Sequence, residues 1–147
     1  MIRLATQHDE AKVRDCAEQA YARYIPLIGK RPAPLLSDFG AQIRDGLIHV
    51  AEADEGSFQG FIVFYQTDQS FLLENVAVLP AWSGKGVGRA LIAYCEDAAR
   101  RVGALSVRLY TNAAMVDNVA LYARLGYSEI SRARQNGFDR VFFEKGL

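Results

Sequence analysis

The residues with the clearest chemical use lie in a glycine-rich loop that follows an apolar strand and leads into a helix. Three glycines alternate in this loop, at Gly84, Gly86 and Gly88. Glycine adopts backbone angles that other residues avoid, and it lets a ligand approach the main chain closely. The first turn of the helix adds N–H groups without partners and the positive end of the helix dipole. Together these features predict an anion cradle suited to a pyrophosphate.

Two other phosphate-binding loops have a similar spacing of glycines, and both fit this segment poorly. A Walker A loop needs Gly-Lys followed by Ser or Thr, whereas Lys85 is followed by Gly86. The dinucleotide fingerprint GxGxxG needs a third glycine where Arg89 stands, and it usually lies in the first βα turn of a domain. A tight turn without a ligand is the remaining alternative.

The elements that must position this loop follow from the spacing of apolar residues. Alternating or continuous apolar runs predict strands at 2–5, 47–51, 60–65, 71–78, 105–110, 127–131 and 140–144. Apolar residues at intervals of three and four predict helices at 9–24, 38–45, 88–102 and 118–125. This order predicts an α/β fold, in which a mixed, largely antiparallel sheet of about seven strands has helices on both faces. Segments 71–78 and 105–110 should form a parallel βαβ unit.

Two connections are expected to lack regular structure. Residues 25–36 contain three prolines and one glycine, which is too many for a regular helix or strand. Asn136-Gly137 is a strong hairpin signal between 127–131 and 140–144, and the connection is expected to be longer than two residues.

Length and composition limit the class of protein. The 147 residues fit one domain, 1–147, and leave no room for a second substantial core. Lys plus Arg and Asp plus Glu number 17 each, which disfavours a nucleic-acid partner. No apolar segment resembles a targeting sequence or could span a bilayer, so we expect no membrane partner and a cytoplasmic location. Cys16 and Cys95 lie on apolar helix stripes and are expected to be buried thiols, and no metal site is expected.

The glycine loop resembles motif A of the GNAT superfamily of acetyl-CoA-dependent N-acetyltransferases, whose signature is Arg/Gln-x-x-Gly-x-Gly/Ala after the fourth strand. Gly86 and Gly88 match its two glycines, and the order of elements matches over nearly the whole chain. Ser83 stands where the signature has Arg or Gln. This difference affects one side-chain contact with the cofactor and does not affect the backbone amides of the loop. The resemblance implies that acetyl-CoA contacts the strand end and the loop, at Val76, Ala77, Val78, Ser83, Gly84, Lys85, Gly86, Val87, Gly88 and Arg89.

A second segment, 118–127, resembles another signature of the same family, Asn-x-x-Ala-x-x-x-Tyr-x-x-x-Gly-Phe/Tyr, with a shorter spacing from Asn118 to the tyrosine. Asn118 and Tyr122 are four residues apart and share a helix face. The resemblance implies that Asn118 contacts the cofactor and that Tyr122 protonates the departing thiolate. The alternative is that Tyr122 is a core aromatic residue.

Direct acetyl transfer also needs a base for the amine and a donor to the thioester carbonyl. The resemblance assigns the carbonyl donor to a backbone N–H near Val76 to Val78. Glu74 precedes Val76 by two residues and therefore shares its sheet face, and similar family members carry a glutamate there. Glu74 is the candidate base, and the alternative is a strand carboxylate held by an arginine such as Arg108. His8 and His49 are interpreted as non-catalytic.

The resemblance therefore predicts an enzyme that moves an acetyl group from acetyl-CoA directly to a primary amine, on a small molecule or a protein N-terminus. The irregular segment 24–32 is expected to shape the acceptor site. Two alternatives stay open, an acyl-CoA-binding module without turnover and a transferase that uses a longer acyl-CoA. The acceptor's identity is open, and so is the formation of a homodimer. The aromatic segment 141–143 is either an edge for such a dimer or part of the core.

Overall fold

The computed structural model describes all 147 residues, which form two compact units. One unit contains residues 1–64 and 75–95, and the other contains residues 65–74 and 96–147. Seven strands are hydrogen-bonded in the order β1-β2-β3-β4-β5-β7-β6. Their bounds are β1 Ile2–Leu4, β2 Ile48–Glu52, β3 Phe58–Thr67, β4 Ser70–Val78, β5 Ser106–Asn112, β6 Ser128–Gln135 and β7 Phe138–Gly146. The predicted α/β fold with a largely antiparallel sheet is confirmed. The single domain over 1–147 stays a prediction.

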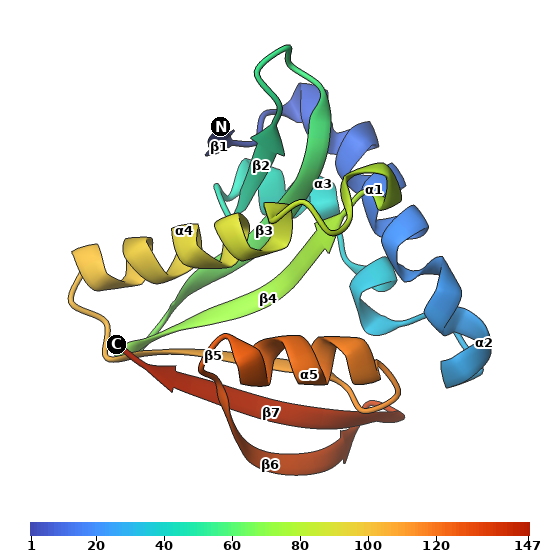
Figure 1. The fold of residues 1–147 in the computed structure, drawn as a ribbon, viewed down its shortest axis with the longest axis vertical. Helices are drawn as coiled ribbons and strands as arrows, with labels where there is room; N and C mark the ends of the chain where they lie inside the picture. The colour runs from blue at the N-terminus through green and yellow to red at the C-terminus, as the bar shows by residue number, and fades with distance from the viewer. The chain divides into compact units, whose positions relative to one another are not determined.

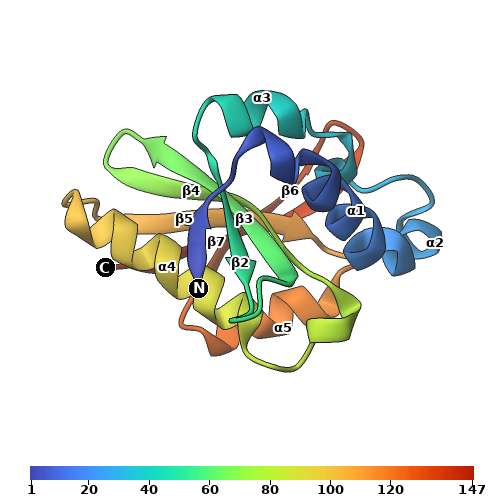
Figure 2. The same ribbon diagram turned by 90° about the horizontal axis from the view of Figure 1, so that it is seen from above.

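The first unit places helices on both faces of its strands (Figures 1 and 2). Here β1 pairs with β2 and β2 pairs with β3, both antiparallel. Viewed from above, α1 and α3 lie on one side of these strands and α4 on the other (Figure 2). The three helices span Glu10–Tyr21, Phe39–Arg44 and Val87–Arg101. Phe39 of α3 meets Phe61 of β3 edge to face, with ring centroids 5.6 Å apart, so both rings are buried in the core of this unit.

The second unit is built on β5 and its two neighbours. β4 runs parallel to β5, as the βαβ prediction requires, and β5 is antiparallel to β7, which pairs with β6. Helix α5, Val116–Arg124, packs on one face of these strands through Tyr122, whose ring centroid lies 5.9 Å from that of Phe143 (Figure 1). Alternation along β7 places Arg140 and Phe142 on the opposite face.

The proline-rich stretch is more regular than the sequence suggested. It contains a one-turn helix, α2, at Ile25–Ile28 and a 3-10 turn at Ala33–Leu36. Pro26 occupies the first turn of α2, where the N–H that proline lacks would have no intrahelical acceptor. Gly29 then ends the helix with φ at 84°. The prediction that this stretch lacks regular elements was wrong.

The final hairpin has a shorter turn and longer strands than the sequence predicted. β6 ends at Gln135 and β7 begins at Phe138, so the connection consists of Asn136 and Gly137 alone. Both residues have positive φ, 52° and 79°, as a type I′ turn requires. The predicted longer connection was wrong, because β6 continues through a run of exposed residues that carries no apolar signal.

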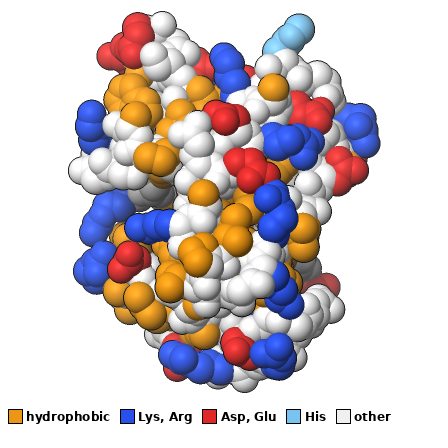
Figure 3. Space-filling view, turned by 90° about the vertical axis from the view of Figure 1, so that its right-hand side faces the viewer, with side chains coloured by type: hydrophobic (Ala, Val, Ile, Leu, Met, Phe, Trp, Pro, Cys, Tyr) orange, Lys and Arg blue, Asp and Glu red, His pale blue; other side chains and the backbone are white.

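Asp38 caps α3 by accepting a hydrogen bond from the Ala41 amide at 3.0 Å. The expectation that Cys16 and Cys95 are buried thiols is confirmed, because both are buried and neither forms a disulfide. Acidic and basic side chains are interspersed on the face that carries α1 and α2 (Figure 3). No helix is long and apolar enough to cross a bilayer.

Candidate functional site

The glycine loop is built by backbone conformations that favour glycine. A 3-10 turn at Pro80–Trp82 leads into it, and α4 begins at Val87. Gly84 and Gly86 have φ of 74° and 85°, and a Cβ on either would meet no atom within 4 Å. Open space and positive φ together leave the main chain of the loop accessible to a ligand.

The first turn of α4 faces this accessible backbone. The Ala90 amide donates to the Gly86 carbonyl at 3.0 Å, so the amides that precede it in the turn have no acceptor within the helix. A Cβ on Gly88 would lie 3.6 Å from Val78 Cγ2, which places the helix start against the end of β4. Loop, helix start and strand end are therefore together in the first unit, and they fit the phosphate groups of a nucleotide cofactor.

Lys85 provides a charge beside this loop. Its ammonium lies 5.1 Å from the centroid of the Trp82 ring, a cation–π contact. The side chain therefore folds back over the turn that leads into the loop. Ser83, in place of Arg or Gln, supplies only a hydroxyl at the start of the loop.

Tyr21 anchors the end of β4, a role that the sequence did not reveal. Its hydroxyl lies 2.7 Å from Asn75 Oδ1 and 3.0 Å from the carbonyl oxygen of Val76. A hydroxyl has one proton, so it donates to one of the two oxygens at a time. The contact links α1 to the strand segment at which the thioester carbonyl is expected. The sequence did place Tyr21 on the apolar stripe of a helix. A tyrosine buried in this way needs a hydrogen-bond partner for its hydroxyl, and this need was the one available signal.

Glu74 lies in the second unit and is held by a tyrosine. The Tyr65 hydroxyl donates to Glu74 Oε1 at 3.1 Å. Burial and then the neighbouring Glu74 charge raise the pKa of Tyr65 to about 12, so Tyr65 remains a donor at neutral pH. Arg108, the arginine suggested as an alternative partner, forms an ion pair with Glu144.

Tyr122 is buried in the second unit, with 5% of its surface exposed. Its ring centroid lies 5.9 Å from those of Tyr127 and Phe143. Asn118, one turn earlier in α5, donates through Nδ2 to the Met115 sulfur at 3.5 Å. The aromatic contacts fix the direction of the Tyr122 ring from two sides.

Tyr127 is itself fixed by a buried charged pair. Its hydroxyl donates to Glu96 Oε2 at 2.8 Å, and Lys145 Nζ donates to Glu96 Oε1 at 3.1 Å. A carboxylate that is bonded through both oxygens is held rigidly and is compensated in charge. The wall behind Tyr122 therefore cannot shift without breaking this network.

The structure distributes the predicted site residues between the two units. Val76, Ala77, Val78 and the loop 83–89 belong to the first unit, and Glu74, Asn118 and Tyr122 belong to the second. β4 carries both Glu74 and Val76, and both are half-buried on the same side of the strand. The structure adds two tyrosines to the predicted site residues, Tyr21 in the first unit and Tyr65 in the second.

The other titratable candidates lack catalytic surroundings. His49 stacks on Phe64, with ring centroids 5.1 Å apart, and contacts Tyr94 at 4.9 Å. Burial lowers the pKa of His49, which keeps the ring neutral. Burial raises the pKa of Cys16 to about 12, so it supplies no thiolate at neutral pH. No group of three or more His, Cys, Asp or Glu side chains is arranged to hold a metal ion.

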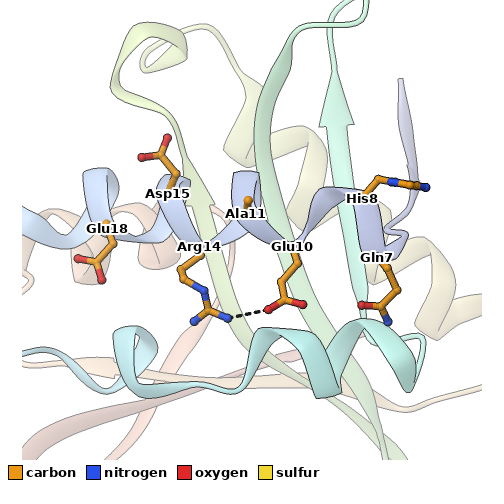
Figure 4. Close-up of a pocket in the computed structure, with 7 residues that line it drawn as sticks. All are labelled: Gln7, His8, Glu10, Ala11, Arg14, Asp15 and Glu18. Atoms are coloured by element: carbon orange, nitrogen blue, oxygen red, sulfur yellow. Dashed lines mark hydrogen bonds and ion pairs between the residues drawn. The ribbon is translucent and has the colours of Figure 1, made fainter.

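A shallow hollow lies along the outer face of α1 and the turn before it (Figure 4). Its charged side chains include Glu10 and Arg14, which pair at 2.9 Å. His8 and Glu18 also line it, and none of the predicted site residues does. His8 is exposed and lies in the turn before α1.

Known proteins resemble the chain in sequence and in fold. The profile of the acetyltransferase (GNAT) domain matches residues 44–129. Streptothricin acetyltransferase of Streptomyces lavendulae is 29% identical over 86 residues, which are 57% of this chain and 46% of that enzyme. The matched part thus spans about half the length of that relative.

The solved structures that match the whole chain include two from Thermoplasma species. PaiA N-acetyltransferase from Thermoplasma acidophilum, in complex with coenzyme A, has a TM-score of 0.82 at 18% identity, and the match covers 98% of that protein's chain. Ard1 from Thermoplasma volcanium has a TM-score of 0.79 at 20% identity, and the match covers 97% of that protein's chain. These two likenesses concern the fold. Because the domain profile covers more than half of the sequence, the chain belongs to the GNAT acetyltransferase family.

Proposed function

We propose that this chain is an N-acetyltransferase that transfers the acetyl group of acetyl-CoA directly to a primary amine. The observation that carries the proposal is the open glycine loop, in which Gly84 and Gly86 have positive φ and no neighbour where a Cβ would lie. Bound acetyl-CoA supplies the acetyl thioester. The amides of residues 83–89, at and before the first turn of α4, would hold its pyrophosphate.

The backbone and three side chains have assigned roles in this proposal. An N–H in the segment Val76 to Val78 donates to the thioester carbonyl, and Tyr21 holds that segment in place. Glu74 Oε2 or a water held by it accepts the proton of the attacking amine, while Oε1 is bonded to Tyr65. Tyr122 donates the proton that the departing thiolate needs, and Asn118 contacts the cofactor.

Calorimetric titration with acetyl-CoA tests the proposal, with NAD and ATP as controls. We expect binding of acetyl-CoA alone, followed by thiol release when amine acceptors are added. Absence of acetyl-CoA binding by the folded protein would refute the proposal. Binding without turnover of any amine would instead identify an acyl-CoA-binding module, and tighter binding of longer acyl-CoA would identify another donor.

Two aspartate variants test the loop directly. Gly86→Asp places a carboxylate where the pyrophosphate should lie, so affinity for acetyl-CoA should fall at least about tenfold. Gly56→Asp is the matched control, because Gly56 also has positive φ, 94°, and a Cβ there would likewise meet no atom within 4 Å. Both variants bear the same backbone strain, and only Gly86→Asp should lose affinity. Equal affinities in the two would disprove the cradle.

A further inference from the structure

Arg140 of β7 is a buried cation without a carboxylate partner. The residue is 9% exposed. Its guanidinium carbon lies 4.3 Å from the centroid of the Tyr110 ring and 5.9 Å from that of Phe138. Its side chain makes one hydrogen bond, which Nη1 donates to Gln135 Oε1 at 3.1 Å. Two aromatic faces and a neutral amide therefore surround a full positive charge.

This arrangement leaves hydrogen-bond donors available. A guanidinium carries five N–H donors in a planar fork, and the protein engages one of its nitrogens here. No Arg140 nitrogen is among the buried side-chain atoms without a partner, so its other nitrogens reach solvent. A cation that is stacked, largely desolvated and open along one edge is prepared to bind an anion.

The open edge lies on the face of the sheet that carries the candidate base. Arg140 is opposite Asn112 in β5, and Tyr110 is opposite Phe142 in β7, so alternation places Arg140 and Tyr110 on one face. Leu72 in β4 is opposite Arg108 in β5, and Arg108 is on the same face as Tyr110. Glu74 follows Leu72 by two residues and therefore shares that face. Glu74, Tyr110 and Arg140 thus lie on the same face of β4, β5 and β7, whereas α5 packs on the other face through Tyr122.

The separation along this face suits a small molecule. β4 and β7 lie on either side of β5, so their backbones are roughly 10 Å apart where the strands are paired. Glu74 follows the last β4–β5 pair, Leu73 and Leu109, and Arg140 is opposite Asn112 further along β5, so the guanidinium reaches back over the Tyr110 ring. The glutamate and arginine side chains rise from the same face and shorten the gap between their charged ends. A compact molecule with a cationic amine at one end and an anion at the other can therefore contact both.

We propose that Arg140 binds a carboxylate of the acceptor, and that the acceptor is consequently an amine that also carries a carboxylate, of amino-acid size. The inference rests on the proposed N-acetyltransferase function. A carboxylate matches the guanidinium fork with two parallel hydrogen bonds, and Tyr110 holds the plane of that fork. With the carboxylate held there, the amine of the acceptor is directed toward Glu74.

The competing explanation is that Arg140 only braces the β6–β7 hairpin through Gln135. Two variants separate the two roles. Arg140→Met keeps an unbranched side chain against the rings and removes the charge. Gln135→Ala removes the hydrogen bond to the hairpin and keeps the charge. Arg140→Met removes both the proposed contact with substrate and the contact within the hairpin. Gln135→Ala removes only the contact within the hairpin.

Kinetics with paired acceptors give the decisive measurement. A panel of L-amino acids is compared with the matching amino-acid amides, which lack the carboxylate. The wild type should favour the acid over the amide in kcat/KM by at least about tenfold, since a buried guanidinium fork rejects a partner without charge. Arg140→Met should abolish this preference by lowering kcat/KM for the acid far more than for the amide, and Gln135→Ala should keep the preference. A preference that survives in Arg140→Met would overturn the inference, as would equal loss for acid and amide.

A binding measurement distinguishes failure of this inference from failure of the proposed function. The Arg140 Nε–Hε resonance, assigned by its absence from Arg140→Met, is followed by NMR while glycine or glycinamide is added without acetyl-CoA. Saturable shifts with glycine alone support the carboxylate site even if no amine accepts an acetyl group. Equal responses to both compounds, or none, refute the site even if acetyl transfer is found.

Discussion

The hydroxyl of Tyr65 lies 3.1 Å from Glu74 Oε1, so a tyrosine in β3 holds the carboxylate proposed as the base in β4. Because the pKa of Tyr65 is raised to about 12, this donor is retained throughout the pH range in which the enzyme would work. A neutral hydrogen bond to one carboxylate oxygen fixes the orientation of the group without neutralising its charge. The pair therefore supplies a positioned acceptor for a proton.

Replacement of the carboxylate tests its role. Glu74→Gln keeps the shape and an oxygen that can accept from Tyr65, but it removes the base, so kcat/KM should fall about 100-fold or more. Tyr65→Phe is the matched control, which keeps the base and removes only its orientation, and it should have a smaller effect. Steady-state thiol release measures both. Near wild-type activity of Glu74→Gln at every pH tested would exclude Glu74 as the base.

The proposed acid is tested by removing a single oxygen. Tyr122→Phe keeps the ring against Tyr127 and Phe143, so the fold and the cofactor affinity should be retained. Turnover should fall by about tenfold or more, because the thiolate would leave without its proton donor. Tyr127→Phe serves as a comparison, since it loses a bond to Glu96 instead. Unchanged turnover in Tyr122→Phe would show that Tyr122 is only a core residue.

Gly60 sets the position of the strand end that should donate to the thioester. A Cβ added to Gly60 would lie 2.5 Å from the Ala77 carbonyl oxygen and 3.1 Å from the Val78 Cα, both main-chain atoms. Gly60→Ala must therefore displace β4 just before the glycine loop. We expect a lower melting temperature and weaker acetyl-CoA binding together. Calorimetry would contradict the expectation if the variant bound acetyl-CoA as tightly as the wild type.

Local patterns were sufficient to predict the glycine loop and the βαβ unit, because both depend on residues close together in the chain. The features that were missed depend on contacts between distant segments. The Tyr65–Glu74 bond requires the two strands to be in register, and the burial of Arg140 requires the Tyr110 ring from β5. The extent of β6 was missed because all its residues are exposed. Pro26 marked a helix start that was interpreted as a break.

The Arg3–Asp9 ion pair in the first unit should contribute to the stability of the fold and not to catalysis. The guanidinium of Arg3 bonds Asp9 Oδ2 at 2.8 Å and Oδ1 at 2.9 Å, and the Thr6 amide bonds Oδ2 at 2.8 Å. These bonds lower the pKa of Asp9 from 3.8 to about 2, although burial alone would raise it.

A depressed folded-state pKa means that the ionised form stabilises the fold above the unfolded value. The contribution is complete above about pH 4 and is lost as the pH falls from 3.8 toward 2. Asp9→Asn should therefore lower the free energy of unfolding at neutral pH by about 2 kcal/mol, by the ordinary conversion of a pKa shift. Denaturant unfolding at neutral pH and near pH 2 checks this, with Asp97→Asn at the exposed Arg100 pair as control. A loss of the same size at both pH values would show that the carboxylate charge is not the cause.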